Sequence, residues 1–460
     1  MKWPCKLFIF LLFSNLPVLS LPQSEEVPAP EKTSYFKDVW PIVQRRCQGC
    51  HQPAFMKADL LLTRYEGFEK GGENGPAFIP GNPDDSIVMA YLTGEIEPQM
   101  PSEESPLSNE EILIFSQWIQ EGANDDTPSE MRLRLPSTEP PIYQLPPVIT
   151  AIAYSPNGRF LAVSGFREVL VHRADGSGIE ARLVGISDRI QSLEFSSRGF
   201  FLMAAGGTPA QFGEVQFWHI PTQKLMRSVT TCYDTVFGAS FSPDAKKVVF
   251  GCSDRTVRVI DRLSGEELLR MGHHENWVLA AVFGMDGKRT VSVGRDRAAK
   301  LTDALSGAFF ENINLLRGEL TAVARHPARD AVVIGGEGRI PYYYLMDRPR
   351  KMLIADDSTL IREFERQQGE ILAISFSPDG KKIAIASTSD EVPIYSVENG
   401  DRLATCQTQG AIYTLAFHPN GEQLATGGFD GHIRVFDVDS GRLSTKFIPV
   451  PIEKKLQVSN

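Results

Sequence analysis

The sequence predicts a multidomain protein in which a small all-α domain precedes an all-β propeller of seven blades. Three observations support this prediction. The chain has 460 residues, more than one domain of roughly 100 to 200 residues. Two proline-rich stretches divide it, and the apolar pattern between them is helical but alternates with period two afterwards. We expect these segments: signal peptide 1–20, linker 21–33, helical domain 34–126, proline-rich linker 127–147, propeller 148–452 and tail 453–460.

The first residues have the features of a secretory signal peptide. Lys2 and Lys6 precede an apolar run from Leu7 to Phe13, and small or polar residues follow around Ser20. The apolar run is too short to span a bilayer, which favours cleavage over a retained anchor, the alternative. We therefore expect an exported protein of the periplasm or cell envelope, with no transmembrane segment in the mature chain.

The charge is distributed unevenly. Hydrophobic residues make up 42% and charged residues 23% of the chain, as in ordinary globular proteins. Residues 31–126 contain 17 Asp or Glu against 7 Lys or Arg, which accounts for the whole formal net charge of −10. An acidic field argues against nucleic acid as a partner and favours a partner protein with a basic surface. The alternative is that these carboxylates only keep the protein soluble.

Three helices are expected between the proline-rich stretches. Apolar residues recur at helical spacing from Tyr35 to Val43, and this helix ends at Arg46. A second, short helix is expected from Asp84 to Leu92. Ser108 followed three positions later by Glu111 is typical of a capping box that opens the third helix.

A repeat follows the second linker. Its clearest unit is a strand, a tight turn and a strand, with the strands at 151–154 and 160–163. A period of about 40 to 45 residues with four short strands is typical of a propeller blade. Either the tail after Ser440 or the strand-like segment 142–145 could supply the outermost strand of the last blade. Aligning the turns gives seven positions: Pro156, Ser197, Pro243, Met285, Pro327, Pro378 and Pro419.

Two units resemble WD repeats. The segments 253–261 and 429–437 carry that family's turn aspartate and terminal dipeptide, although Ile-Asp and Phe-Asp replace the typical Trp-Asp. The resemblance implies a WD-repeat-like β-propeller, a fold that serves many functions. His326 and His418 align with serines in turns of sister repeats, and His273 lies near a position where the family's histidine is structural. We therefore predict no catalytic residues in the propeller.

The run Cys47-Gln48-Gly49-Cys50-His51 predicts one covalently bound haem c per chain. Two thiols three positions apart can each form a thioether with a haem vinyl group, and the adjacent His51 becomes the proximal iron ligand. A zinc site would need about four ligands, and no second CxxC or HxxxH pair lies nearby. A redox dithiol would follow a strand, whereas a helix is expected here.

Three methionines after the motif are candidates for the distal iron ligand. Met56 lies only five residues beyond His51, and Met89 falls inside a predicted helix where packing is its simpler role. Met100, followed by Pro101 on a loop, is the predicted ligand. The alternative is an open or differently filled site.

The segment from Tyr35 to Ala123 resembles the planctomycete-type cytochrome c domain. The motifs that carry the resemblance are CQGCH at 47–51, ADLLL at 58–62, KGG at 70–72, IPGNP at 79–83, QMP at 99–101 and WIQEGA at 118–123. It implies a covalent haem with Met100 as sixth ligand. In such domains a backbone carbonyl usually accepts a hydrogen bond from the ligating imidazole, and we expect Pro80 to supply it. Trp118 could pack near the haem edge or belong to the helix core.

These features together predict an exported c-type cytochrome for single-electron transfer, with the propeller as a docking platform for a redox partner. The alternative is a haem enzyme, or a redox sensor or peroxidase, in which the propeller or a dissociable Met100 provides a reactive site. Cys5 leaves with the signal peptide, and Cys47 and Cys50 are assigned to haem, so Cys232, Cys252 and Cys406 remain and are expected to be buried free thiols.

Overall fold

A computed structural model describes residues 32–453 except 54, 103–104, 133–138 and 347–356. The expected signal peptide at 1–20 and most of the first linker lie outside the described residues. Within the described part of the chain, no helix is long and apolar enough to cross a membrane.

The N-terminal region is a small helical domain, as predicted. Its last long helix begins with the expected capping box, in which Ser108 accepts a hydrogen bond from the Glu111 backbone and the Glu111 side chain accepts one from Ser108. The elements are η1 (Tyr35–Val39), α1 (Trp40–Arg46), β1 (His51–Gln52), β2 (Phe55–Met56), η2 (Lys57–Asp59), α2 (Tyr65–Lys70), α3 (Ile87–Thr93), α4 (Asn109–Gln120) and α5 (Ser129–Arg132).

Aromatic side chains form the centre of this domain. Trp118 of α4 is 1% exposed, stacks on Phe68 with ring centroids 5.8 Å apart, and meets Phe78 edge-on at 4.9 Å. Tyr35 packs against the same indole, with ring centroids 5.3 Å apart. Aromatic pairs in these geometries add to the stabilisation from apolar burial. These aromatic contacts join α4 to η1 and to α2.

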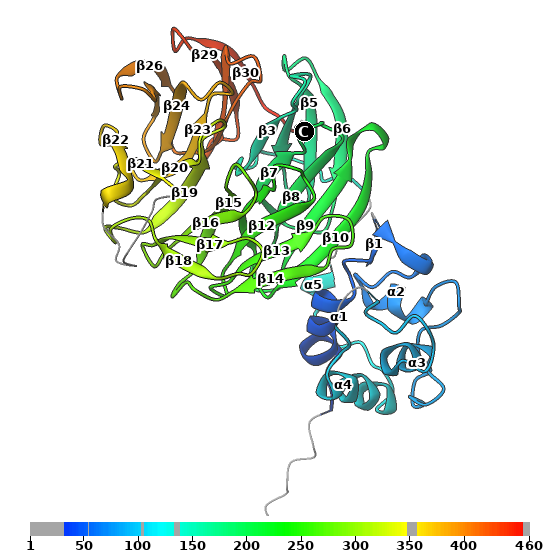
Figure 1. The fold of residues 1–460 in the computed structure, drawn as a ribbon. Coiled ribbons are helices and arrows are strands. Elements are labelled where there is room, and N and C mark those ends of the chain that lie inside the picture. The colour runs from blue at the N-terminus through cyan, green and yellow to red at the C-terminus, as the bar shows by residue number, and fades with distance from the viewer. Residues whose placement is uncertain (1–31, 54, 103–104, 133–138, 347–356, 454–460) are drawn as a thin grey trace, which may run out of the picture. The chain divides into compact units, whose positions relative to one another are not determined.

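The second region is a propeller of seven four-stranded antiparallel sheets, which follow one another around a ring (Figure 1). The first strand of each blade contacts the first strand of the next, including β27 with β3. The strands, blade by blade, are β3 (Ile152–Tyr154), β4 (Phe160–Ser164), β5 (Glu168–Arg173) and β6 (Ile179–Val184); β7 (Arg189–Phe195), β8 (Phe201–Thr208), β9 (Phe212–His219) and β10 (Lys224–Cys232); β11 (Val236–Phe241), β12 (Lys247–Cys252), β13 (Val257–Asp261) and β14 (Glu267–Met271); β15 (Val278–Phe283), β16 (Arg289–Gly294), β17 (Ala299–Asp303) and β18 (Phe309–Asn312); β19 (Leu320–Arg325), β20 (Ala331–Gly336), β21 (Tyr342–Leu345) and β22 (Leu360–Glu363); β23 (Ile371–Phe376), β24 (Lys382–Ser387), β25 (Glu391–Ser396) and β26 (Arg402–Gln407); β27 (Ile412–Phe417), β28 (Gln423–Gly428), β29 (Ile433–Asp437) and β30 (Leu443–Phe447).

The seven predicted turns all lie between the first and second strands of a blade. A serine hydroxyl caps several of them: Ser242 accepts a hydrogen bond from the Lys247 backbone at 2.9 Å, and Ser377 accepts one from Lys382 at 2.9 Å. In the fifth blade His326 takes this place, and its Nδ1 accepts a hydrogen bond from the Ala328 backbone at 3.1 Å. The turn histidines are therefore structural, as the alignment predicted.

The buried structural histidine of the fourth blade is His274, one residue after the expected His273. Its Nδ1 lies 2.9 Å from the Asp296 carboxylate, and its Nε2 lies 2.7 Å from the Ser292 hydroxyl. His273 is exposed, with Nε2 2.9 Å from the Gly307 carbonyl. The sequence pattern identified the segment but not which of two adjacent histidines points inward.

The last blade takes its fourth strand from the C-terminal tail. Strand β30 pairs with β29, which resolves the two alternatives for closure in favour of the tail after Ser440. Tyr143 makes only an isolated parallel bridge with Ile452. The ring also closes through backbone contacts, since the Ile149 amide donates to the Gly428 carbonyl at 3.0 Å.

Candidate functional site

The CxxCH motif forms a tight turn at the end of α1. The Cys47 amide donates to the Val43 carbonyl at 3.0 Å, which continues the helical pattern by one residue. The amides of Cys50 and His51 both donate to the Cys47 carbonyl at 3.2 Å. A helix rather than a strand thus precedes the motif, as expected, and the turn places both thiols and the imidazole within a single loop of chain.

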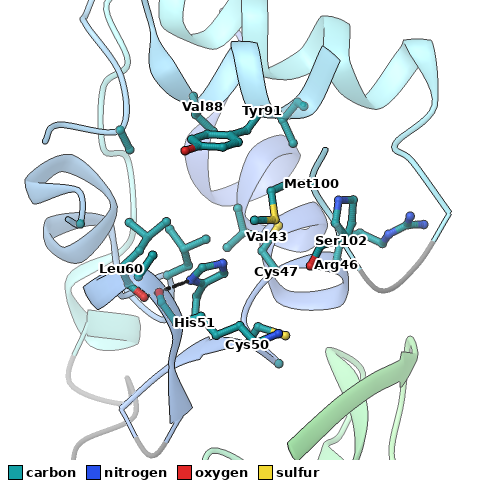
Figure 2. Close-up of a pocket in the computed structure, with 18 of the residues that line it drawn as sticks. Val43, Arg46, Cys47, Cys50, His51, Leu60, Val88, Tyr91, Met100 and Ser102 are labelled. Atoms are coloured by element: carbon teal, nitrogen blue, oxygen red, sulfur yellow. Dashed lines mark hydrogen bonds between the residues drawn. The ribbon is translucent and has the colours of Figure 1, made fainter. Parts of the chain in front are cut away.

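The His51 side chain is held by backbone carbonyls. It is 7% exposed, and its Nδ1 lies 3.1 Å from the Lys57 carbonyl oxygen and 3.3 Å from that of Leu60 (Figure 2). A proton on Nδ1 satisfies these acceptors and leaves Nε2 with a free lone pair. Burial lowers the pKa of the His51 imidazole below its ordinary value. The ring is therefore neutral near pH 7, the form that ligates a metal.

The expectation that Pro80 accepts this hydrogen bond is wrong. The turn around Pro80 packs instead against the end of α4, where the Gly81 amide donates to the Ile119 carbonyl at 2.7 Å and Gln120 Nε2 donates to the Gly81 carbonyl at 3.2 Å. Directly after β2 the chain folds back through η2, and this places the Lys57 and Leu60 carbonyls beside His51.

A largely apolar cavity of about 470 Å³ lies next to the motif. Cys47, Cys50, His51 and Met100 all line it. Its volume lies within the usual range of cofactor and ligand pockets. Apolar walls around a few polar groups suit a flat apolar cofactor that is held at a few points. The main apolar side chains of the walls are Val43, Leu60, Phe68, Val88, Leu92 and Phe115.

Met100 is the methionine that the structure brings to this cavity. Figure 2 shows its side chain projecting into the same space as the ring of His51. The Met100 amide donates to the Tyr91 carbonyl at 2.9 Å, which ties the loop to α3. Met56 is 44% exposed, and Met89 is buried in the helical core at 9%. Neither is among the cavity residues, so Met100 is the one of the three candidate methionines that lines the cavity.

Trp118 belongs to the core of the helical domain and not to the cavity wall. Its indole Nε1 donates to the Asn124 carbonyl at 3.0 Å, which fixes the ring at the end of α4. Of its two expected roles, the structure shows the place in the helix core. Phe68 and Phe115 occupy the wall instead.

Sequence reasoning missed most of the cavity wall. Val88, Tyr91 and Leu92 of α3 line the cavity, while Met89 points into the core. Residues three and four apart share one face of a helix, so Val88, Tyr91 and Leu92 lie on the face of α3 that meets the cavity. No local pattern, however, identifies which face meets a cofactor.

The fold and the site define a class of protein: a helical domain with two thiols, an imidazole and a thioether at one apolar cavity, followed by a seven-bladed propeller. Comparison with protein families agrees with both parts. Residues 47–104 match the family model described as planctomycete cytochrome C. Residues 223–261 and 400–437 match the WD domain, G-beta repeat. The chain therefore combines a domain that matches planctomycete cytochrome C with a propeller that contains WD repeats, and both matches support a haem-binding protein with a platform for protein interactions.

The two WD matches are offset from the blades in the same way. Each begins with the outermost strand of one blade and ends with the third strand of the next, spanning β10 to β13 and β26 to β29. Each matched repeat therefore contains the outermost strand of one blade and the first three strands of the next, so the repeat links two neighbouring blades.

Proposed function

We propose that this chain is an exported c-type cytochrome that carries one haem c and transfers single electrons. Cys47 and Cys50 would hold the haem through thioethers, His51 would be its proximal ligand and Met100 its distal ligand. The observation that carries the proposal is the convergence of these four side chains on one apolar cavity. The propeller would serve as the docking platform for a redox partner protein.

The residues of the cavity fit such a role. A bound haem c would supply an iron that changes its oxidation state by one electron. The carbonyls of Lys57 and Leu60 keep the His51 ring in one orientation and one tautomer. The contact of Met100 with the Tyr91 carbonyl restrains the loop that carries the thioether. A thioether ligand raises the reduction potential relative to a second histidine, and apolar walls exclude water. Little in this site would need to rearrange when an electron arrives.

The charge of the chain supports a protein partner with a basic surface. Residues 31–126, which include the haem motif, carry the entire formal net charge of −10. Opposite charges on two proteins raise their rate of encounter, and salt screens this effect. Export is proposed from the signal-like residues 1–20 alone.

The haem content of the chain tests this proposal. We expect the chain isolated from the periplasmic fraction to contain one haem per polypeptide, of the c type in a pyridine haemochrome spectrum. The reason is that the described residues present one CxxCH motif at one cavity. More than one haem per polypeptide, or a haem that is not of the c type, would instead support a haem enzyme with a second centre.

A further inference from the structure

Two of the three propeller thiols lie together at the junction of two blades. Cys232 is the last residue of β10, the outermost strand of the second blade, and Cys252 is the last residue of β12 in the third blade. Residues 233–235 connect β10 to β11, where Val236 pairs with Cys252 across the strand ladder. The crossing from blade to blade therefore brings the two cysteines close, although 20 positions separate them in the sequence.

The two cysteines lie at the same blade junction. The Cys232 thiol donates to the Asp234 carbonyl at 2.9 Å, in the connection that leads directly to Val236, the strand partner of Cys252. Both cysteines are buried, and both belong to one apolar cluster that includes Phe217 and Phe250. Disulfide formation requires close sulfurs on a backbone that is already in place. In the structure both cysteines are free thiols on neighbouring blades.

A buried cation lies beside the pair. Arg258 is 3% exposed, interacts electrostatically with both sulfurs, and is held by the carboxylate of Asp254 and the hydroxyl of Thr231 at 2.9 Å. Burial and the neighbouring thiol raise the pKa of Cys252, and the charge of Arg258 acts against this rise. A nearby cation favours the thiolate, which is the form that attacks a disulfide. In the folded propeller burial outweighs the charge of Arg258 and keeps the Cys252 thiol protonated, so the exchange takes place before the blades close over the two cysteines.

We propose that Cys232 and Cys252 are a disulfide site that links the second and third blades. The oxidant is a disulfide, carried by an oxidoreductase or a small thiol compound, that meets the chain while it folds or while the 233–235 connection is open. One cysteine thiolate attacks the oxidant and releases one of its thiols, and the second cysteine attacks the resulting mixed disulfide and releases the other. One S–S bond forms in the chain, and two electrons and two protons leave on the two thiols of the oxidant.

Cys406 provides an internal control. It is equally buried, but it lies in β26 of the sixth blade, within a different apolar cluster. The disulfide is also independent of the haem proposal, because Cys47 and Cys50 lie in the other domain. Closing the chain between two blades restricts the unfolded state, so oxidation is expected to stabilise the propeller.

The test is mass spectrometry of the full chain refolded in a mixture of oxidised and reduced glutathione. The protein is denatured and alkylated with iodoacetamide without reductant, then digested. We expect one cross-linked peptide pair that contains Cys232 and Cys252, with Cys406 alkylated. Alkylation of Cys232 and Cys252 to the same extent as Cys406 would overturn the proposal. The variant C47A/C50A is expected to form the same bridge, which separates this result from the question of haem attachment.

A second measurement does not depend on recovering the cross-linked peptide. The thermal midpoint of the oxidised wild-type propeller is expected to fall when dithiothreitol is added, because the reduced chain loses the constraint. The paired variants Cys232→Ala and Cys252→Ala are expected to show the same midpoint with and without reductant. A wild-type midpoint that is insensitive to reductant contradicts the bridge, even if one of the variants fails to fold.

Discussion

Replacing Cys47 and Cys50 together with alanine is expected to abolish the covalent attachment of haem. In the proposed site each thiol forms one of the two thioethers, and the turn after α1 holds both thiols next to the cavity. The haem-dependent peroxidase stain of the denatured chain on a gel should disappear, and the intact mass should equal that of the polypeptide alone. The propeller, whose strands begin at Ile152, should keep its β-sheet circular dichroism.

Cys406→Ala is the matched control for this variant. It removes a buried cysteine of the sixth blade and leaves the helical domain unchanged, so the haem stain should remain at the wild-type intensity. A double variant C47A/C50A that still carries haem through denaturation would show that the cofactor is attached elsewhere or held differently.

The second large effect is expected for Met100→Ala. Loss of the thioether removes the ligand that favours the reduced iron and leaves a position at which small molecules can bind. We expect the reduction potential to fall by at least about 59 mV, a tenfold change in a one-electron equilibrium. The weak far-red band of methionine ligation should vanish, and carbon monoxide should bind the reduced protein.

Met56→Ala is the control, because Met56 lies in the same domain but is 44% exposed and outside the cavity. The reduction potential and the visible spectrum of the Met56→Ala variant should match those of the wild type. If Met100→Ala also leaves both unchanged, Met100 is not the ligand. Binding of carbon monoxide to the wild-type protein would favour the sensor or peroxidase alternative, in which Met100 dissociates.

Local sequence signals predicted most of the fold. The capping box of Ser108 and Glu111 marks the start of α4, and Arg46 ends the helix before the haem motif. The spacing of the turns from Pro156 to Pro419 predicted the seven blades. These signals succeed because caps, turns and alternating strands are set by neighbouring residues along the chain. Short α2 (Tyr65–Lys70) was not predicted, since six residues carry too little periodicity.

The side chains proposed to hold the haem could be predicted from the sequence, and the rest of the candidate site could not. The CxxCH spacing indicated Cys47, Cys50 and His51, because covalent haem attachment requires this spacing. The carbonyls that hold His51 were assigned wrongly to Pro80, because a backbone carbonyl carries no signature in the side-chain sequence. The pairing of propeller cysteines was also invisible, since it depends on how one blade crosses to the next.

A potentiometric titration of the haem-loaded full chain, followed by its visible spectrum, tests the central claim most directly. A single carrier with two permanent ligands, His51 and Met100, should give one reversible wave with a slope of about 59 mV per tenfold change in the ratio of oxidised to reduced protein. Carbon monoxide should not shift this wave. Two waves, or a potential that rises in the presence of carbon monoxide, would contradict single-electron transfer at one closed site.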